Sequence, residues 1–503
     1  MKFYSIMKHF YALILSFFTV PFSFSQTQNI AFTAVGKGVA TTFLTDYHCL
    51  GINSSMLGLG TGFQGKRFTM GSSEFGFGIY SDSLSVDKLR NLSKAVRSSI
   101  TNKSLDSLDY QRQIEATAQY AQAGVAMFAE FNWMGFSFQN EKFGGIAFNI
   151  RENYQWYSKF NDNITDLIFR GKLASLFDSI TVDFGGVQTT VAYDENMSQD
   201  SLDAVVSGKI AIPINLSAIT KGSELRMVWN RSYNLGYGRK LFGKDSVFTV
   251  YGGIGGRIIS SMAMFNMVSD DDGLVMYTSL TPSLNVNFDP TIPGTNPLTS
   301  SSGLLPPSVG QGYGVDLSAT VEIGKFLRMS AAVNNIGSVT YKRNVYRVAD
   351  TLFGDFSLSG LSSEDITKTV NQMLQEGGLL KLEGQEKYVL ANAADFRLGA
   401  SLKFKEFAHF GIDFVAPFNK DNPGSIQNAV IAVGGEIRPA KWLALNVGYF
   451  GGGIYKSNIP CGITFILKNG GYEFGIASRD ALTFFTKNSN SISGALGFAR
   501  FRF

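Results

Sequence analysis

Long segments of alternating apolar and polar residues constrain this chain more than any other feature. Between residues 395 and 405, apolar side chains occupy every second position from Phe396 to Phe404, and most positions between them are charged or polar. Similar alternation occurs in residues 225–237, 315–323 and 429–438. Because successive side chains of a strand point to opposite faces, each segment predicts a β-strand with one apolar and one polar face.

Two architectures explain such strands. In a soluble sandwich the apolar faces meet in a core, whereas in a membrane barrel they face lipid and the polar faces line the lumen. The segments approach the roughly 9–11 residues that a tilted strand needs to cross a bilayer. Aromatic residues such as Tyr154, Trp156, Trp442 and Tyr449 recur near their ends. We therefore expect an all-β fold, a closed antiparallel transmembrane β-barrel of about 14 strands over residues 66–503.

The composition excludes several other classes of protein. Only 17% of the 503 residues are charged, 45% are hydrophobic and 13% are aromatic, which argues against disorder. The formal net charge of +4 argues against a nucleic-acid partner. With two cysteines, Cys49 and Cys461, the chain has no disulfide framework. Whether these two pair stays open, because sequence spacing does not set the distance between them.

The first 25 residues predict a cleaved secretory signal peptide. Lys2 and Lys8 precede an apolar stretch from Phe10 to Val20, and small residues follow before Gln26. The alternative, an uncleaved anchor, needs a longer apolar run of about 18 residues. We expect export to the outer membrane, where lipid surrounds the barrel.

Three polar, helix-prone insertions interrupt the predicted strands. They lie near residues 83–122, 160–178 and 362–377. We place them outside the hydrocarbon layer, because irregular backbone exposed to lipid is not tolerated.

The last strand ends at an aromatic residue. Phe501 and Phe503 alternate with Arg500 and Arg502, and extending the alternation backwards places Ala495, Gly497 and Ala499 on the phenylalanine face. A terminal aromatic that closes an alternating strand resembles the signal by which outer-membrane barrels are recognised for insertion. We therefore expect Phe501 and Phe503 to form a membrane-insertion signal.

Residues 26–65 are not strand-like, and they carry a family resemblance. Residues 36–53 read GKGVATTFLTDYHCLGIN, and Leu57-Gly58 follow. This run resembles the N-terminal element of the FadL/PorV-like outer-membrane barrels, in which a short segment enters and plugs the barrel. The family usually has Asn-Pro-Ala where this chain has Asn53-Ser54-Ser55, so the helix that follows loses the proline that favours its start.

A second segment resembles the same family. Residues 312–337 resemble the paired strands of PorV-like members, which end in an Asn-x-Gly turn, here Asn335-Ile336-Gly337. The chain looks closest to an uncharacterised branch found in bacteria with type IX secretion. The resemblance implies an N-terminal plug segment over residues 26–65.

The plug and the polar strand faces supply the candidate site residues. Apolar plug residues could line a ligand pocket or could simply pack the plug into the barrel. Charged residues inside the barrel could form salt bridges that hold the plug or could line a selective pore. The plug candidates are Phe43, Leu44, Leu50, Ile52, Asn53, Met56 and Leu57. The lumen charges are Arg257, Glu322, Arg328, Arg397, Asp413, Glu436, Arg500 and Arg502.

Motifs for catalysis or cofactors are weak. Residues 60–65 fit G-x-G-x-x-G, but the glycines lead into a strand, which favours a turn over a nucleotide site. His48 beside Cys49 suggests a nucleophile pair, although adjacent side chains usually point apart. We expect no enzyme activity, no catalytic residues, no metal and no cofactor.

Two functions remain. In the first, which we favour slightly, the barrel is a partner-binding scaffold or accessory subunit of a protein-export or assembly complex, as the resemblance to PorV-like members implies. Its partners would be other envelope proteins. In the second, the barrel transports hydrophobic small molecules across the outer membrane, as FadL does.

Overall fold

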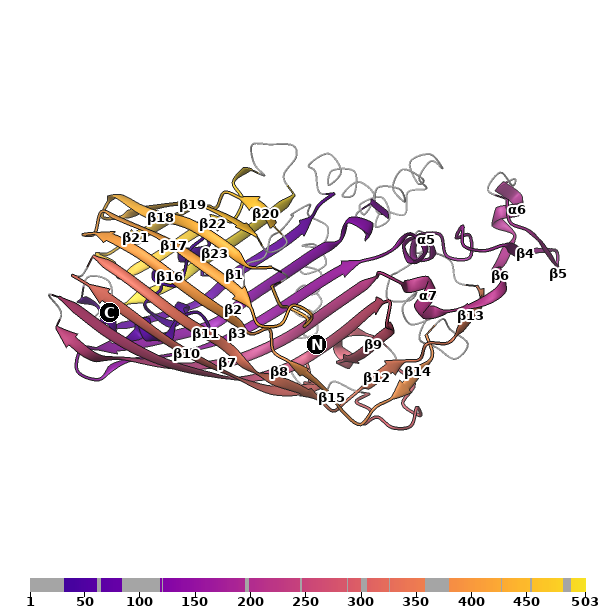
Figure 1. Ribbon diagram of the computed structural model, residues 1–503, viewed down its shortest axis with the longest axis horizontal. Coiled ribbons are helices and arrows are strands. Elements are labelled where there is room, and N and C mark those ends of the chain that lie inside the picture. The colour runs from indigo at the N-terminus through magenta and orange to yellow at the C-terminus, as the bar shows by residue number, and fades with distance from the viewer. Residues whose placement is uncertain are drawn as a thin grey trace, which may run out of the picture.

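The computed structural model describes most of the chain in antiparallel strands (Figure 1). The described residues are 31–60, 65–83, 118–119, 121–194, 199–244, 247–286, 288–299, 305–324, 326–357, 380–426, 428–452, 455–482 and 490–503. Fourteen described strands form one barrel. They are β1 Phe68–Ser81, β2 Val125–Asn140, β3 Gly144–Lys159, β7 Glu224–Lys244, β8 Phe248–Asp270, β10 Gly310–Ile323, β11 Leu327–Tyr341, β16 Asp395–Phe404, β17 Ala408–Pro417, β18 Val430–Ala440, β19 Leu443–Gly452, β21 Cys461–Leu467, β22 Tyr472–Ser478 and β23 Ser491–Arg502.

The barrel is closed. Each of these strands pairs antiparallel with the next, and β23 returns to pair with β1 from Ser491 opposite Tyr80 to Arg502 opposite Thr69. Closure removes the free sheet edges that hydrocarbon would leave unpaired. The prediction of a closed antiparallel barrel of about 14 strands is therefore confirmed.

The outer surface of the barrel is apolar all the way round. Each of the fourteen described strands carries at least one large apolar side chain that is 37% to 61% exposed. Soluble proteins rarely expose a continuous apolar surface of this extent, whereas lipid-facing barrels require it. One such residue per strand, in barrel order, is Met70, Trp133, Ile146, Tyr233, Ile254, Tyr313, Met329, Leu398, Phe410, Val433, Val447, Ile463, Ile476 and Phe498.

The two ends of the barrel differ. At one end, which we call the short-turn end, strands are joined by tight connections such as residues 141–143, 405–407 and 441–442, and the C-terminus lies there (Figure 1). At the other, the long-loop end, connections run to tens of residues. In bacterial barrels the short turns face the periplasm. Within the described residues, no helix is long and apolar enough to span a membrane.

Beyond the long-loop end lie shorter elements, several of them at the far right of Figure 1. A four-stranded sheet has the order β13-β6-β4-β5. Its strands are β4 Ser179–Phe184, β5 Val187–Ala192, β6 Val205–Asn215 and β13 Leu352–Phe356. The helices α5 Asp162–Arg170, α6 Gln199–Asp203, α7 Leu216–Thr220 and η4 Pro282–Leu284 and the strands β9 Gly273–Leu280, β12 Val345–Val348, β14 Leu382–Gly384 and β15 Tyr388–Ala391 complete this region. The short strand β20 Tyr455–Asn458 pairs with β19 in the barrel wall.

The predicted insertions and signal peptide are described only in part. Helix α5 occupies nine residues of the segment 160–178. Of residues 83–122, only a few at either end belong to the described chain, whereas residues 362–377 and the signal peptide over residues 1–25 lie outside it. These assignments stay predictions.

One expectation about β23 is wrong. Phe501 and Phe503 point outward and are 38% and 65% exposed, but Ala495 and Gly497 face the lumen, where Phe32 lies against Gly497. The pairing of β23 with β22 shifts register between Glu473 and Gly475. Because side chains alternate with a period of two, this one-residue irregularity moves the earlier residues to the opposite face.

Candidate functional site

Residues 31–59 of the N-terminal segment lie inside the barrel against its inner wall, and we call them the plug. It contains α2 Phe32–Val35, η1 Tyr47–Cys49 and η2 Ser54–Leu59. Gly38 and Gly51 adopt φ of 72° and 74°, a region that favours glycine, and allow the chain to reverse direction. Asp46 caps η1 by accepting a hydrogen bond from the His48 amide. Helix η2 starts at Ser54, although the chain lacks the proline usual in the resembling family.

The plug has a small core of its own. Leu44, Leu50, Ile52, Met56 and Leu57 are at most 4% exposed and pack together with Tyr47 and Cys49. Ala147 on β3 is the one buried barrel residue in this described cluster. Asn53 is fully buried, and its side-chain amide donates to the Thr41 carbonyl oxygen at 2.8 Å and to Thr320 Oγ1 at 3.1 Å. Of the predicted pocket residues, only Phe43 lies in a different cluster, described below.

Glycines face the plug on the inner wall of the barrel. A Cβ added at Gly253 or Gly238 would overlap the backbone of Ser55 or Ser54, and one at Gly434 or Gly448 would overlap the carbonyl of Lys37. The plug backbone therefore lies directly against the strand backbones. This close approach explains part of the high glycine content of the chain, because any larger residue would displace the plug.

The plug reaches every strand of the described barrel. Polar contacts join it to β1, β2, β3, β10, β11, β17, β18 and β23. Glycine-lined contacts join it to β7, β8, β16, β19, β21 and β22. A segment of this length that contacts all fourteen described strands stabilises the barrel around its whole circumference.

One cluster of charges ties the plug to β1, β22 and β23. His48 Nε2 lies 2.9 Å from Glu74, and the Tyr47 hydroxyl donates to the same carboxylate at 2.6 Å. Arg500 bonds to Asp46 of the plug, and both Arg500 and Arg502 pair with Glu473 on β22. All of these groups are buried or nearly so, and burial makes loss of any one partner costly.

A second polar contact fixes the plug to β17 and β18. Asp413 Oδ2 accepts from the backbone amides of Ala40 and Thr41 at 2.7 and 2.9 Å and from the Thr41 hydroxyl at 2.9 Å. Lys37 Nζ lies 2.7 Å from Glu436. A buried carboxylate with three donors holds this part of the plug through defined geometry.

The remaining predicted lumen charges pair within the wall. Arg257 on β8 bonds to Asp316 on β10 at 2.7 Å and packs beside Gly51 of the plug. Arg328 pairs with Glu322 at 2.9 Å, and Arg397 pairs with Asp395 at 2.7 Å. All eight predicted lumen charges thus have partners, and five of them, Asp413, Glu436, Arg257, Arg500 and Arg502, contact the plug.

Toward the long-loop end, a cluster of apolar side chains lies on the plug inside the lumen. Val39 and Phe43 of the plug lie beneath inward residues near the upper ends of six strands, and Ile426 of the loop 418–429 joins them. Phe43 also stacks on His409 with ring centres 3.9 Å apart. We call this set the upper cluster: Val39, Phe43, Tyr80, Ala126, Tyr157, Val415, Ile426, Val430, Ala432 and Phe450.

The loop 418–429 folds inward over the upper cluster. Asn422 and Ser425 are each 8% exposed, and the Asn422 side-chain amide donates to the Asn392 carbonyl at 3.4 Å. Arg226 on β7 donates to the Lys420 carbonyl at 3.1 Å across the lumen. The upper cluster is therefore enclosed by the plug below and this loop above.

The barrel wall beside the upper cluster has a break in its backbone ladder. Strand β20 ends at Asn458 and pairs with β19 alone among the described strands, and Pro460 separates it from β21. Side chains close most of the gap: the Asn458 amide lies 2.8 Å from Ser491 Oγ, which lies 3.2 Å from Asp480. One backbone bond, from Ala481 N to Ile459 O at 2.7 Å, spans it. We call this region the wall break.

Sequence reasoning missed an ion pair on the outer face of the barrel. Glu152 on β3 bonds to Arg231 on β7 at 2.8 Å and is covered by Trp133 and Trp229, whose indole N–H groups donate to it at 3.0 and 2.6 Å. A signal existed, because Arg231 falls on the apolar face of the alternating segment 225–237. A charge at an apolar position of a lipid-facing strand requires a partner.

Comparison with known proteins adds a family and several distant structures. Residues 62–469 match a family model described as "Family of unknown function (DUF5723)". No curated protein sequence matches the chain.

Solved structures similar to the chain include hydrocarbon channels. A TodX deltaS2S3 mutant, described as a monoaromatic hydrocarbon channel, is 11% identical, with 94% of this chain and 97% of that chain covered and a TM-score of 0.42. The toluene transporter TodX of P. putida is 10% identical, with 95% and 99% covered and a TM-score of 0.39. A FadL homologue of Pseudomonas aeruginosa is 10% identical, with 96% and 97% covered and a TM-score of 0.36.

The family match spans β1 through β21 and therefore most of the chain, from which it follows that this protein belongs to the DUF5723 family.

Proposed function

We propose that this protein is a non-enzymatic outer-membrane barrel that transports small hydrophobic molecules. The observation that carries the proposal is the upper cluster, a group of apolar side chains inside the lumen between the plug and the loop 418–429. Sites for small molecules are concave, mostly apolar and enclosed by a few polar groups.

The route out of the upper cluster follows from how the barrel is closed. Downward passage would have to displace a plug that contacts every described strand. Sideways passage would have to part only the wall break, where, within the described part of the chain, side chains and the backbone bond between Ala481 and Ile459 replace the strand ladder. Phe450 of the upper cluster pairs directly with Asn458 at this break. We therefore assign the wall break as the lateral opening between the upper cluster and lipid.

Under this proposal, fewer of the predicted pocket residues contact the transported molecule. Leu44, Leu50, Ile52, Met56 and Leu57 form the core of the plug and stabilise it. Phe43, together with Val39, forms the floor of the upper cluster. The scaffold hypothesis, which the resemblance to PorV-like members implies, stays a prediction.

Uptake by intact cells tests this function. Radiolabelled naphthalene serves as the hydrophobic probe and labelled glucose as the hydrophilic control. Val39→Asp and Phe43→Asp place a charge among the upper-cluster side chains and are expected to reduce naphthalene uptake about tenfold, because an unpaired charge disfavours an apolar compartment. Val187→Asp is the matched control, since Val187 is 67% exposed on β5, outside the barrel.

Folding is checked by heat-modifiable mobility on gels. Loss of naphthalene uptake in both folded lumen variants, with normal uptake by Val187→Asp, supports transport. Uptake equal to that of the unsubstituted protein in folded Val39→Asp and Phe43→Asp would refute it.

A further inference from the structure

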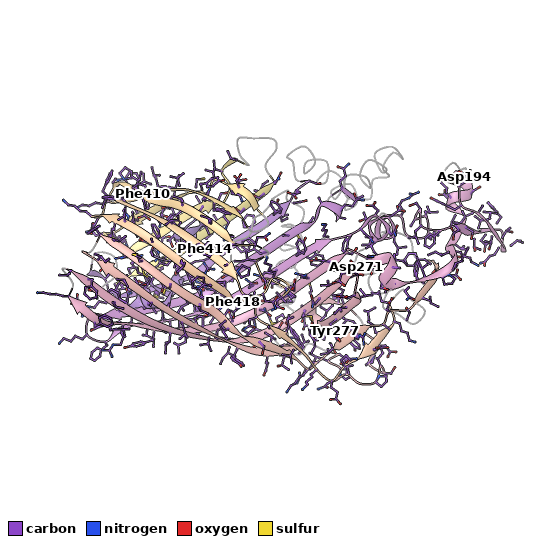
Figure 2. All side chains as sticks on the ribbon, in the orientation of Figure 1. Asp194, Asp271, Tyr277, Phe410, Phe414 and Phe418 are labelled. Atoms are coloured by element: carbon purple, nitrogen blue, oxygen red, sulfur yellow. The ribbon has the colours of Figure 1, made fainter. Side chains whose placement is uncertain are left out.

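The small sheet beyond the long-loop end has two edges that differ in protection. Figure 1 shows β4, β5 and β6 at the far end of the molecule from the C-terminus. Figure 2 labels Asp194, which follows β5, far from Phe410 on the outer face of the barrel. The sheet order β13-β6-β4-β5 leaves β13 and β5 as edges. Exposed edges offer unpaired backbone groups to other chains, and proteins usually guard them.

The β13 edge is guarded. It carries Asp355, contains Gly354, and its pairing with β6 shifts register between Phe353 and Asp355. A charge and an irregular backbone both discourage addition of another strand.

The β5 edge has none of these features. Its six residues read VQTTVA, without charge, proline or glycine, and its pairing with β4 runs without a register shift from Val187 to Ala192. Among the described strands, β4 is its one partner. All six side chains are exposed or half-exposed. β-branched, uncharged residues in an open edge are well suited to pair with a further strand.

The hairpin geometry identifies the backbone groups that the edge offers. Phe184 and Val187 flank a two-residue turn, Gly185-Gly186, with φ of 66° and 90°. The flanking pair of such a hairpin is mutually hydrogen-bonded, so alternate residues from Val187 onward bond to β4. The hydrogen bond from Tyr193 N to Asp178 O, 3.1 Å long, falls at the next position of this alternation. The N–H and C=O groups of Gln188, Thr190 and Ala192 therefore point to the open edge.

The two faces of β5 describe the strand that would fit. Val187, Thr189 and Val191 lie opposite Phe184, Val182 and Ile180 of β4, of which Val182 and Ile180 are buried. At the tip of this face, Phe184 and Val187 remain 56% and 67% exposed. Gln188, Thr190 and Ala192 form the opposite, uncharged face of β5, on which the Gln188 amide donates to Asp183 of β4 at 3.4 Å. An added strand would place apolar residues along the first face and small polar residues along the second.

We propose that the β5 edge is a docking site for an extended, uncharged strand of a partner protein outside the membrane. The added strand extends the small sheet by backbone hydrogen bonds, and its alternate apolar side chains cover Phe184 and Val187. Charge complementarity sets the class of partner, since β5 offers no charge to a charged segment. This binding is independent of transport through the barrel.

A synthetic strand tests the proposal on the full-length protein in detergent. The probe is a fluorescein-labelled peptide, Thr-Val-Thr-Val-Thr-Val, and its control carries proline at the third position. Thr190→Pro removes the central outward N–H without touching the ladder to β4 and is expected to weaken binding about tenfold or more. Thr190→Ala keeps that N–H and is expected to bind like the unsubstituted protein. Gln188→Lys adds an edge charge and is expected to weaken binding without altering the backbone.

Hydrogen exchange provides the second measurement. On addition of the peptide, exchange of the Gln188, Thr190 and Ala192 amides should slow, while protected amides facing β4, such as Val191, show that the sheet is intact. The proposal is overturned if the unsubstituted protein binds the peptide no better than its proline control, or if Thr190→Pro and Gln188→Lys both bind like the unsubstituted protein.

Discussion

The lower and upper halves of the lumen are closed in different ways. In the lower half, the plug backbone lies against wall glycines such as Gly238 and Gly253, and buried charges pin it to the strands. In the upper half, apolar side chains meet one another beneath an inward loop, and the adjoining wall is interrupted at Pro460. Backbone contact leaves little room for adjustment, whereas side chains can change rotamer. The lower half is thus tightly packed, and we propose that the upper half is the part that opens.

Removing the plug should break this contrast most strongly. Deletion of residues 31–59 leaves the strand pairing of the barrel intact but removes the segment that fills the lumen. We expect the intact protein to be nearly silent in planar bilayers and the deleted form to conduct ions in large steps. Equal conductance from both forms would show that residues 31–59 do not close the lumen.

Two glycine substitutions on β8 test the contact between the plug and the wall of the barrel. A Cβ at Gly253 would overlap Ser55 of the plug, whereas a Cβ at Gly256 on the same strand meets nothing closer than 3.9 Å. We expect Gly253→Val to lower the free energy of unfolding by about 3 kcal/mol and Gly256→Val to leave it nearly unchanged. The transition temperature of heat-modifiable mobility reports both, and equal shifts would argue against a tight plug.

A smaller effect is expected at the C-terminus. Phe503 is 65% exposed at the short-turn end, and its backbone bonds to Phe68 close the barrel. A charge on the lipid face costs up to roughly 2–4 kcal/mol at mid-bilayer and less near an interface. Phe503→Lys should therefore reduce the yield of inserted protein more than its stability, and Phe503→Tyr should insert normally. Unchanged amounts of folded Phe503→Lys in the membrane would contradict a role in insertion.

The barrel could be predicted from sequence because its signal is local. Strand β16 lies at Asp395–Phe404, where alternation predicts it, and β10 contains the predicted segment 315–323. The predicted face of a side chain is wrong beyond a point where one extra residue enters the strand ladder. Ser73, with φ of 56°, and Trp133 lie at such irregularities. A third irregularity, the register shift between β22 and β23, turns Ala495 and Gly497 inward. A single inserted residue leaves almost no trace in composition but reverses every side chain beyond it.

The site was harder to predict than the barrel. The plug segment and the lumen charges could be identified, but the residues that touch them come from strands far away in sequence. Ile52 and Phe43 look equally suited to a pocket in the sequence, yet Ile52 packs inside the plug and Phe43 faces the upper cluster. The wall glycines carry no side chain that could indicate contact, and their role depends entirely on what lies opposite.

The most direct test of the account is a reversible lock across the wall break. The side chains of Asn458 and Ser491 lie in contact there. In a Cys461→Ser background, Asn458→Cys and Ser491→Cys together should form a disulfide on oxidation, and the single-cysteine variants serve as controls. The account predicts that oxidation reduces naphthalene uptake of the double variant to background and that a reductant restores it. If the fully cross-linked protein took up naphthalene as fast as the same variant with its disulfide reduced, lateral passage from the upper cluster would be contradicted.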